Sequence, residues 1–168
     1  MILLIQYSPD VLLIRPAIEK EKPMALIQEI IHALLVVQPP HPLFVHFPIA
    51  LISTALFFLL LALWKKSDVL EKIAFANLCV AAVSIIVAGF FGIRDNAVIF
   101  KGLAPNHIAK IVIASILFIL TSATVLLRWR NPNLYQNRFK GLYLAVHIVL
   151  FALVAVQGFL GGIIVYGF

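Results

Sequence analysis

Five ionisable residues that could carry chemistry lie at the edges of long apolar stretches. They are His41, His46, Arg94, Asp95 and His107. Imidazole nitrogens ligate metals and haem iron. Placing an ionisable group inside a membrane costs free energy, so such groups mark candidate functional sites. If the apolar stretches cross a membrane in alternating directions, all five residues lie at one face.

Two of these histidines suggest a haem site. His46 enters the first apolar stretch and His107 opens the third. Neighbouring helix axes lie about 8–10 Å apart, which puts diagonal axes roughly 11–14 Å apart, a gap that two imidazoles and one iron can fill. We expect His46 and His107 to be the axial ligands of a b-type haem. His41 or Asp95 would interact with the ligating histidines and adjust their properties without binding the iron. The spacing does not decide which two of the three histidines bind the iron.

Small residues and cations at the same face fit this interpretation. Glycines let a flat ligand or a neighbouring helix approach closely, and those at this face are Gly89, Gly92, Gly158, Gly161 and Gly162. We expect Gly92, Gly161 and Gly162 to face the cofactor. Arg94, Lys101 or Lys110 would then pair with the haem propionates.

Other interpretations of these residues remain open. The histidines could hydrogen-bond water, lipid headgroups or connector carbonyls, the glycines could serve helix packing, and Asp95 could pair with Arg94. A metal-ion site or small transporter using His41, His46, Asp95 and His107 is less favoured. The half of the spans away from these residues has no charged side chains to form a path for an ion. A cofactor-free accessory subunit, packed against a larger membrane complex through its Phe-rich surface, is the main alternative.

Two further polar residues lie inside the fourth apolar stretch. His147 lies near the opposite face, and we expect it to hydrogen-bond Asn77, with a proton-relay or quinone-contact role as an alternative. Gln157 is expected to hydrogen-bond Ser53, Thr54 or a ligand.

The elements that must position these residues follow from composition. Of 168 residues, 63% are hydrophobic and 12% are charged, against roughly 25% charged in soluble domains. Four stretches lack Asp, Glu, Lys and Arg: residues 43–64, 73–93, 111–127 and 141–168. Each is close to the roughly 20 residues that span a bilayer. We expect an all-α integral membrane protein with helices near 42–64, 70–93, 106–129 and 141–166. Their short connectors give an up-down-up-down four-helix bundle.

The first 38 residues form a separate leader before the four-helix domain at 39–168. Residues 24–37 have helical spacing of apolar positions but are too short to span, so we expect an amphipathic helix lying at the membrane interface. The single cysteine, Cys79, excludes a disulfide framework and a C-x-x-C-H haem attachment. The net charge of +6 lies in connectors beside the spans, a pattern of membrane topology rather than of nucleic-acid binding.

The basic residues also bear on orientation. The first and third connectors hold seven Lys or Arg residues and the opposite face holds six, including those of the leader. Basic residues favour the cytoplasmic side, so we expect both termini outside.

The segment His41-Pro-Leu-Phe-Val-His-Phe-Pro-Ile-Ala-Leu51 resembles the signature of DUF2231, a family of small bacterial membrane proteins. Gly92-Ile-Arg-Asp95, His107 and Gly161-Gly162-Ile-Ile-Val-Tyr166 follow in the same order, so the resemblance covers about residues 39–166. It implies four spans in the bacterial plasma membrane, with histidines at the outer face.

The family resemblance supplies no established activity. Members of the family sometimes occur joined to or beside redox and cytochrome modules. This occurrence favours, as the function, electron transfer between a quinone or reductase and an outer-face partner. Similar sequences often carry another histidine after the closing tyrosine, whereas Gly167-Phe168 follows it here. If that histidine is a ligand in the relatives, the site differs in this chain.

Overall fold

The computed structural model describes residues 23–32 and 40–166, and all regular structure in these ranges is helical. Contacts between residues divide the chain into two units, residues 1–38 and 39–168. The first unit contributes the ten-residue helix α1, Pro23–His32. Leu26, Ile27, Ile30 and Ile31 share one side of α1 and are exposed, the pattern of an amphipathic helix. The remainder of the helix expected at 24–37 lies outside the described residues.

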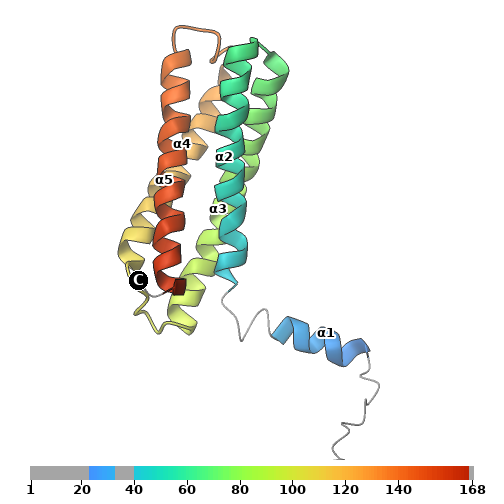
Figure 1. Cartoon of the computed structure of the whole chain (residues 1–168), viewed down its shortest axis with the longest axis vertical. Helices are drawn as coiled ribbons and strands as arrows, with labels where there is room; N and C mark the ends of the chain where they lie inside the picture. Colours follow the sequence, from blue (N-terminus) through green and yellow to red (C-terminus); the bar gives the residue numbers. More distant parts are fainter. Residues whose placement is uncertain (1–22, 33–39, 167–168) are drawn as a thin grey trace, which may run out of the picture. The chain divides into compact units, whose positions relative to one another are not determined.

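The second unit is a bundle of four long helices (Figure 1): α2 (His41–Lys65), α3 (Asp68–Val98), α4 (His107–Arg130) and α5 (Lys140–Tyr166). Each is long and apolar enough to cross a membrane. Packing pairs α2 with α3, α3 with α4, α4 with α5, and α5 with α2. Within the described residues, α2 and α4 are not among the helix pairs that pack side by side, so these two helices are diagonal. The expected all-α, up-down-up-down membrane bundle is therefore confirmed.

A repeat of three and four residues explains why the helices pack in this way. The buried positions of α2 are Pro48, Ile52, Ala55, Leu59 and Ala62. Such spacing keeps one stripe facing the partners in a left-handed bundle. The alanines, which also recur on α3, let the two backbones approach closely.

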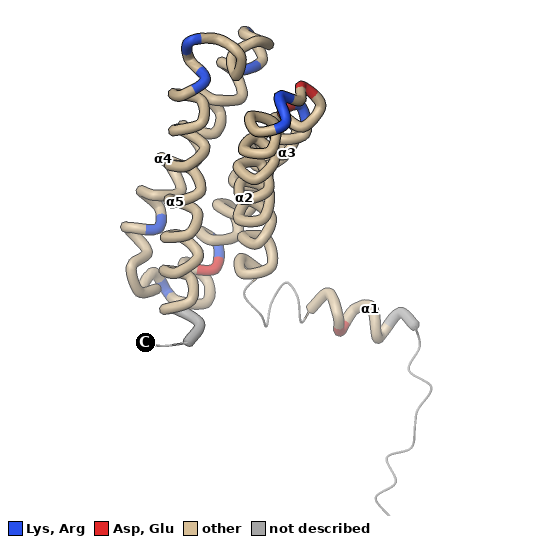
Figure 2. The backbone as a smooth tube through the Cα atoms, turned by 45° about the horizontal axis from the view of Figure 1, so that its top comes forward, with Lys and Arg blue, Asp and Glu red and all other residues tan. Residues whose placement is uncertain are grey.

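The two ends of the bundle differ chemically. The histidine end comprises the starts of α2 and α4, the ends of α3 and α5, and the connector 99–106. The basic end comprises the connectors 66–67 and 131–139 with the adjoining helix turns, where Lys and Arg gather (Figure 2).

One helix boundary differs from the sequence prediction. We expected the second span to stop at residue 93, but α3 continues to Val98 and includes Arg94 and Asp95. These two side chains form an ion pair and Asp95 also binds the start of α2, which satisfies the carboxylate without ending the helix.

Candidate functional site

Asp95 joins two helices at the histidine end. The residue is 3% exposed, and its Oδ2 accepts the backbone N–H of His41 at 2.9 Å. Its Oδ1 accepts a hydrogen bond from Nη1 of Arg94 at 2.8 Å. A carboxylate at a helix N-terminus satisfies a free N–H group and interacts favourably with the helix dipole. Asp95 therefore caps α2 from α3, in addition to the expected pairing with Arg94.

The His41 side chain lies against α3. Its Nδ1 donates to the carbonyl oxygen of Ala88 at 2.9 Å. A Cβ atom added to Gly92 would meet the imidazole at 3.0 Å, which is tighter than an ordinary van der Waals contact. The absence of a side chain at Gly92 therefore leaves room for the imidazole ring of His41.

His107 and His46 face different surroundings. His107 lies on the same side of α4 as Lys110, Ala114 and Leu117, at the spacing of three and four residues that faces the bundle, and its Nδ1 donates to the carbonyl oxygen of Ala104 at 2.8 Å. His46 lies on the exposed side of α2, where its Nδ1 donates to the carbonyl oxygen of Pro42. The structure places His41 and His107 on the inner sides of diagonal helices and His46 on the outside.

The three hydrogen bonds share a consequence for the imidazoles. A carbonyl oxygen only accepts, so Nδ1 must carry the proton in His41, His46 and His107. In a neutral ring this leaves the lone pair on Nε2. Metal-binding histidines are commonly held in this way, with one ring nitrogen donating to a carbonyl and the other binding the metal.

A cavity of about 50 Å³ adjoins His41 between α2, α3, α4 and α5. Its lining is apolar apart from His41 and Gln157, and includes Pro48, Ala88 and Leu117. Gln157 donates to the carbonyl oxygen of Lys110 at 3.2 Å, rather than to Ser53 or Thr54, and its buried Oε1 has no hydrogen-bond partner among the described residues. Two hydrogen-bond acceptors, Nε2 of His41 and Oε1 of Gln157, therefore belong to residues that line one small cavity.

The remaining predicted site residues lie at this end without forming one group. A Cβ added to Gly161 would contact nothing within 4 Å, and Gly162 is the next residue of α5. Lys101 is exposed in the connector and Lys110 is half-buried on α4. Within the described residues, no three His, Cys, Asp or Glu side chains are grouped closely enough to hold a metal ion.

A second polar cluster, which the sequence analysis missed, lies near the basic end. Glu71 is fully buried, and its two carboxylate oxygens accept from Nε and Nη2 of Arg128, both at 2.5 Å. The Tyr143 hydroxyl donates to Oε1 of the same carboxylate at 3.2 Å. The cluster links α3, α4 and α5. Its sequence signal is the continuation of the buried stripe, from Leu78 back to Glu71 and from Thr121 on to Arg128.

His147 belongs beside this cluster. The expected hydrogen bond to Asn77 is wrong: Nδ1 of His147 donates to the carbonyl oxygen of Tyr143 at 2.9 Å, and the Asn77 amide donates to Ile73 of its own helix. The ring packs edge-on against Tyr143, with centroids 4.6 Å apart. Both side chains therefore hydrogen-bond a carbonyl four residues back on their own helix.

These features define a four-span all-α membrane protein with a polar group at each end of its bundle. The chain belongs to DUF2231, described as a predicted membrane protein family, which matches residues 37–168. No curated protein and no solved structure matches the chain.

Proposed function

We propose that the protein is a membrane b-type haem protein that carries electrons, with His41 and His107 as the axial ligands. The main support for this proposal is that both histidines lie on the inner sides of diagonal helices at the histidine end of the bundle. The Nδ1 atom of each donates a hydrogen bond to a backbone carbonyl oxygen. The exposed position of His46 favours His41 over His46 as the partner of His107.

The chemistry of the donors fits a low-spin haem. Two neutral imidazoles leave no open coordination position, so a bound haem supplies one-electron transfer rather than oxygen chemistry. Asp95 holds the start of α2, and with it the backbone of His41, while Ala88 fixes the orientation of the ring. Among the described residues, Lys101 and Lys110 at this end could pair with propionates, and Arg94, which is paired with Asp95, adds positive charge beside them.

The small volume of the cavity favours a second candidate function. The cavity beside His41 holds about 50 Å³, whereas ligand pockets measure about 300–1,000 Å³. A macrocycle therefore enters only if the helix ends separate. A bundle that keeps this packing fits the alternative function, a cofactor-free accessory subunit of a larger membrane complex.

We further propose that the basic end faces the cytoplasm, which places both termini and the histidine end outside. A quinone or membrane reductase would then supply electrons, and a partner at the outer face would accept them. The excess of Lys and Arg at the two connectors of the basic end supports this orientation.

An absorption spectrum of the purified protein, oxidised and then reduced with dithionite, tests the haem assignment. We expect a Soret band and a b-type α band on reduction, both lost in His41→Ala and in His107→Ala. His46→Ala is the matched control and should keep the spectrum. A colourless, iron-free protein that copurifies in a high-mass assembly would replace the haem proposal with the accessory-subunit function.

A further inference from the structure

Seven Lys or Arg residues and only two carboxylates lie at the basic end, in residues 65–72 and 128–140. Neither carboxylate forms an ion pair with any of the six basic residues other than Arg128 in the described part of the chain. Glu71 is buried in the bidentate pair with Arg128, and Asp68 accepts a hydrogen bond from Gln136 at 2.8 Å.

Six cations at this end are left without an ionic partner in the described part of the chain. They are exposed, and none lies within ion-pair distance of a described carboxylate: Lys65, Lys66, Lys72, Arg130, Arg138 and Lys140. They come from all four long helices and both connectors. The described part of the chain therefore leaves this surface with a net positive charge.

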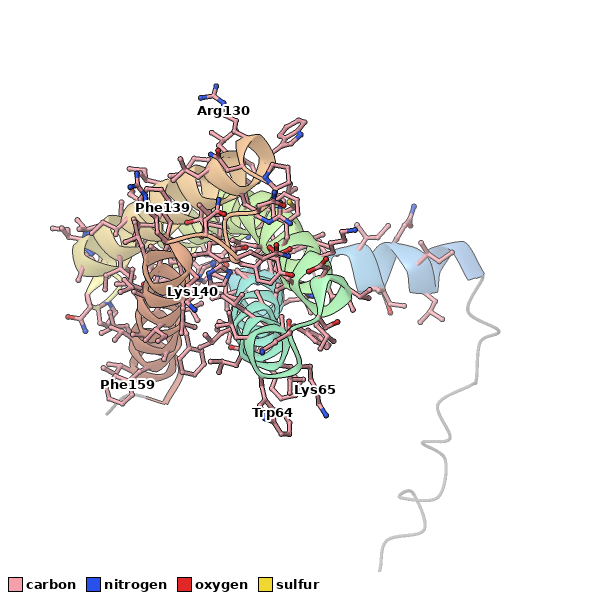
Figure 3. The ribbon with its side chains drawn as sticks, turned by 90° about the horizontal axis from the view of Figure 1, so that it is seen from above. Trp64, Lys65, Arg130, Phe139, Lys140 and Phe159 are labelled. Carbon is pink, nitrogen blue, oxygen red and sulfur yellow. The ribbon has the colours of Figure 1, made fainter. Side chains whose placement is uncertain are left out.

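Two tryptophans fix the depth of the same surface. Trp64 and Trp129 are each the residue before the last of their helices, α2 and α4, and each is 74% exposed. Nζ of Lys65 lies 4.5 Å from the Trp64 ring centroid. Seen along the bundle, Trp64 and Lys65 project on one side and Arg130 on another (Figure 3). Indole rings favour the headgroup region of a bilayer, so cations beside them lie at the level of lipid phosphates.

We propose that the six cations and two tryptophans of the basic end form a binding surface for the headgroups of anionic phospholipids. Lys and Arg supply the charge, and the indole rings hold the surface at the headgroup level. Membrane-adjacent clusters of four to eight basic residues bind anionic lipid in this manner. The surface is separate from the histidine end and does not depend on the proposed haem.

The chain supplies its own probe, because its only two tryptophans lie at this end. The protein is reconstituted in vesicles of equal parts phosphatidylcholine and phosphatidylglycerol, with bromine carried by one lipid or by the other. Bromine quenches tryptophan fluorescence only at close range, so the comparison reports the lipid composition beside Trp64 and Trp129. We expect phosphatidylglycerol to be enriched there by about fivefold, the ratio that one Lys or Arg supplies near a surface.

Replacing all six cations with Gln should bring the two quenching values together, while the control Lys101→Gln at the histidine end keeps them apart. The second measurement raises the salt concentration with the unaltered protein, and it decides the question if the variant with six substitutions does not fold. Salt should also reduce the enrichment of phosphatidylglycerol. Equal quenching by both lipids in the unaltered protein at low salt would overturn the proposal. Loss of the enrichment with inorganic phosphate, but not with chloride at equal ionic strength, would instead assign the surface to soluble phosphate.

Discussion

Two histidines five positions apart on α2 have different environments, and their neighbours explain the difference. His41 is seven residues before buried Pro48, so it continues the stripe that faces the bundle, whereas His46 lies on the outer side. The sequence alone could not separate them, because the lipid-facing side of α2 is as apolar as its packed side. The motif predicted that histidines gather at this end, and only the packing register shows which of them faces inward.

Gly92 offers a test of the inward position of His41. Gly92→Ala would place a Cβ atom 3.0 Å from the imidazole and push the ring away from the Ala88 carbonyl. We expect a loss of about 1–3 kcal/mol in the free energy of unfolding, the usual cost of overpacking. Reversible unfolding in detergent, followed by circular dichroism, measures it.

Gly89→Ala is the matched control on the same helix, because a Cβ atom there meets nothing within 4 Å. Its helix propensity should leave stability unchanged or raise it by up to about 1 kcal/mol. If both variants behave alike, His41 does not pack against Gly92.

At the level of elements, the Glu71–Arg128 pair joins α3 to α4, and Tyr143 adds α5. The helices themselves were predictable from four charge-free stretches of bilayer length. The pair was not, because Glu71 and Arg128 lie just outside those stretches and charges there are usually solvated. Their burial depends on the match in depth between two antiparallel helices, which requires knowledge of the packing.

Arg128→Leu should destabilise the bundle more than the loss of a surface charge would. It leaves the fully buried Glu71 carboxylate without its cation, at an expected cost of about 3–5 kcal/mol. Replacing both residues with Leu removes the buried charges together and should recover most of that loss.

A double-mutant cycle of the two single variants and the double variant, read by unfolding in detergent, measures the coupling. Arg130→Leu is the control, since Arg130 is exposed near the end of the same helix. Additive effects of the two single substitutions would show that the pair is not coupled.

At the level of the whole molecule, the ends of the bundle are unequal. Counted over the sequence, seven basic residues face six, a small difference. The Arg128–Glu71 and Arg94–Asp95 pairs each neutralise one basic residue, one at each end, so six basic residues face five when Arg15, Lys20 and Lys22 of the leader are counted. Ion pairing inside the protein therefore leaves the balance nearly even, and the prediction of orientation depends on the small excess of Lys and Arg at the basic end.

This orientation predicts which connectors can be labelled from outside a cell. Moving one positive charge outward against 100 mV costs about 2.3 kcal/mol, so the six unpaired cations should stay on the cytoplasmic side. Cys79→Ser removes the only cysteine, and Leu103→Cys or Asn133→Cys then adds one in an exposed part of each connector. A membrane-impermeant maleimide should label the cysteine at position 103 in intact cells, and the one at position 133 only after permeabilisation. The reverse pattern would invert the orientation and place the histidine end in the cytoplasm, while leaving the site's geometry and the lipid-binding surface as they are.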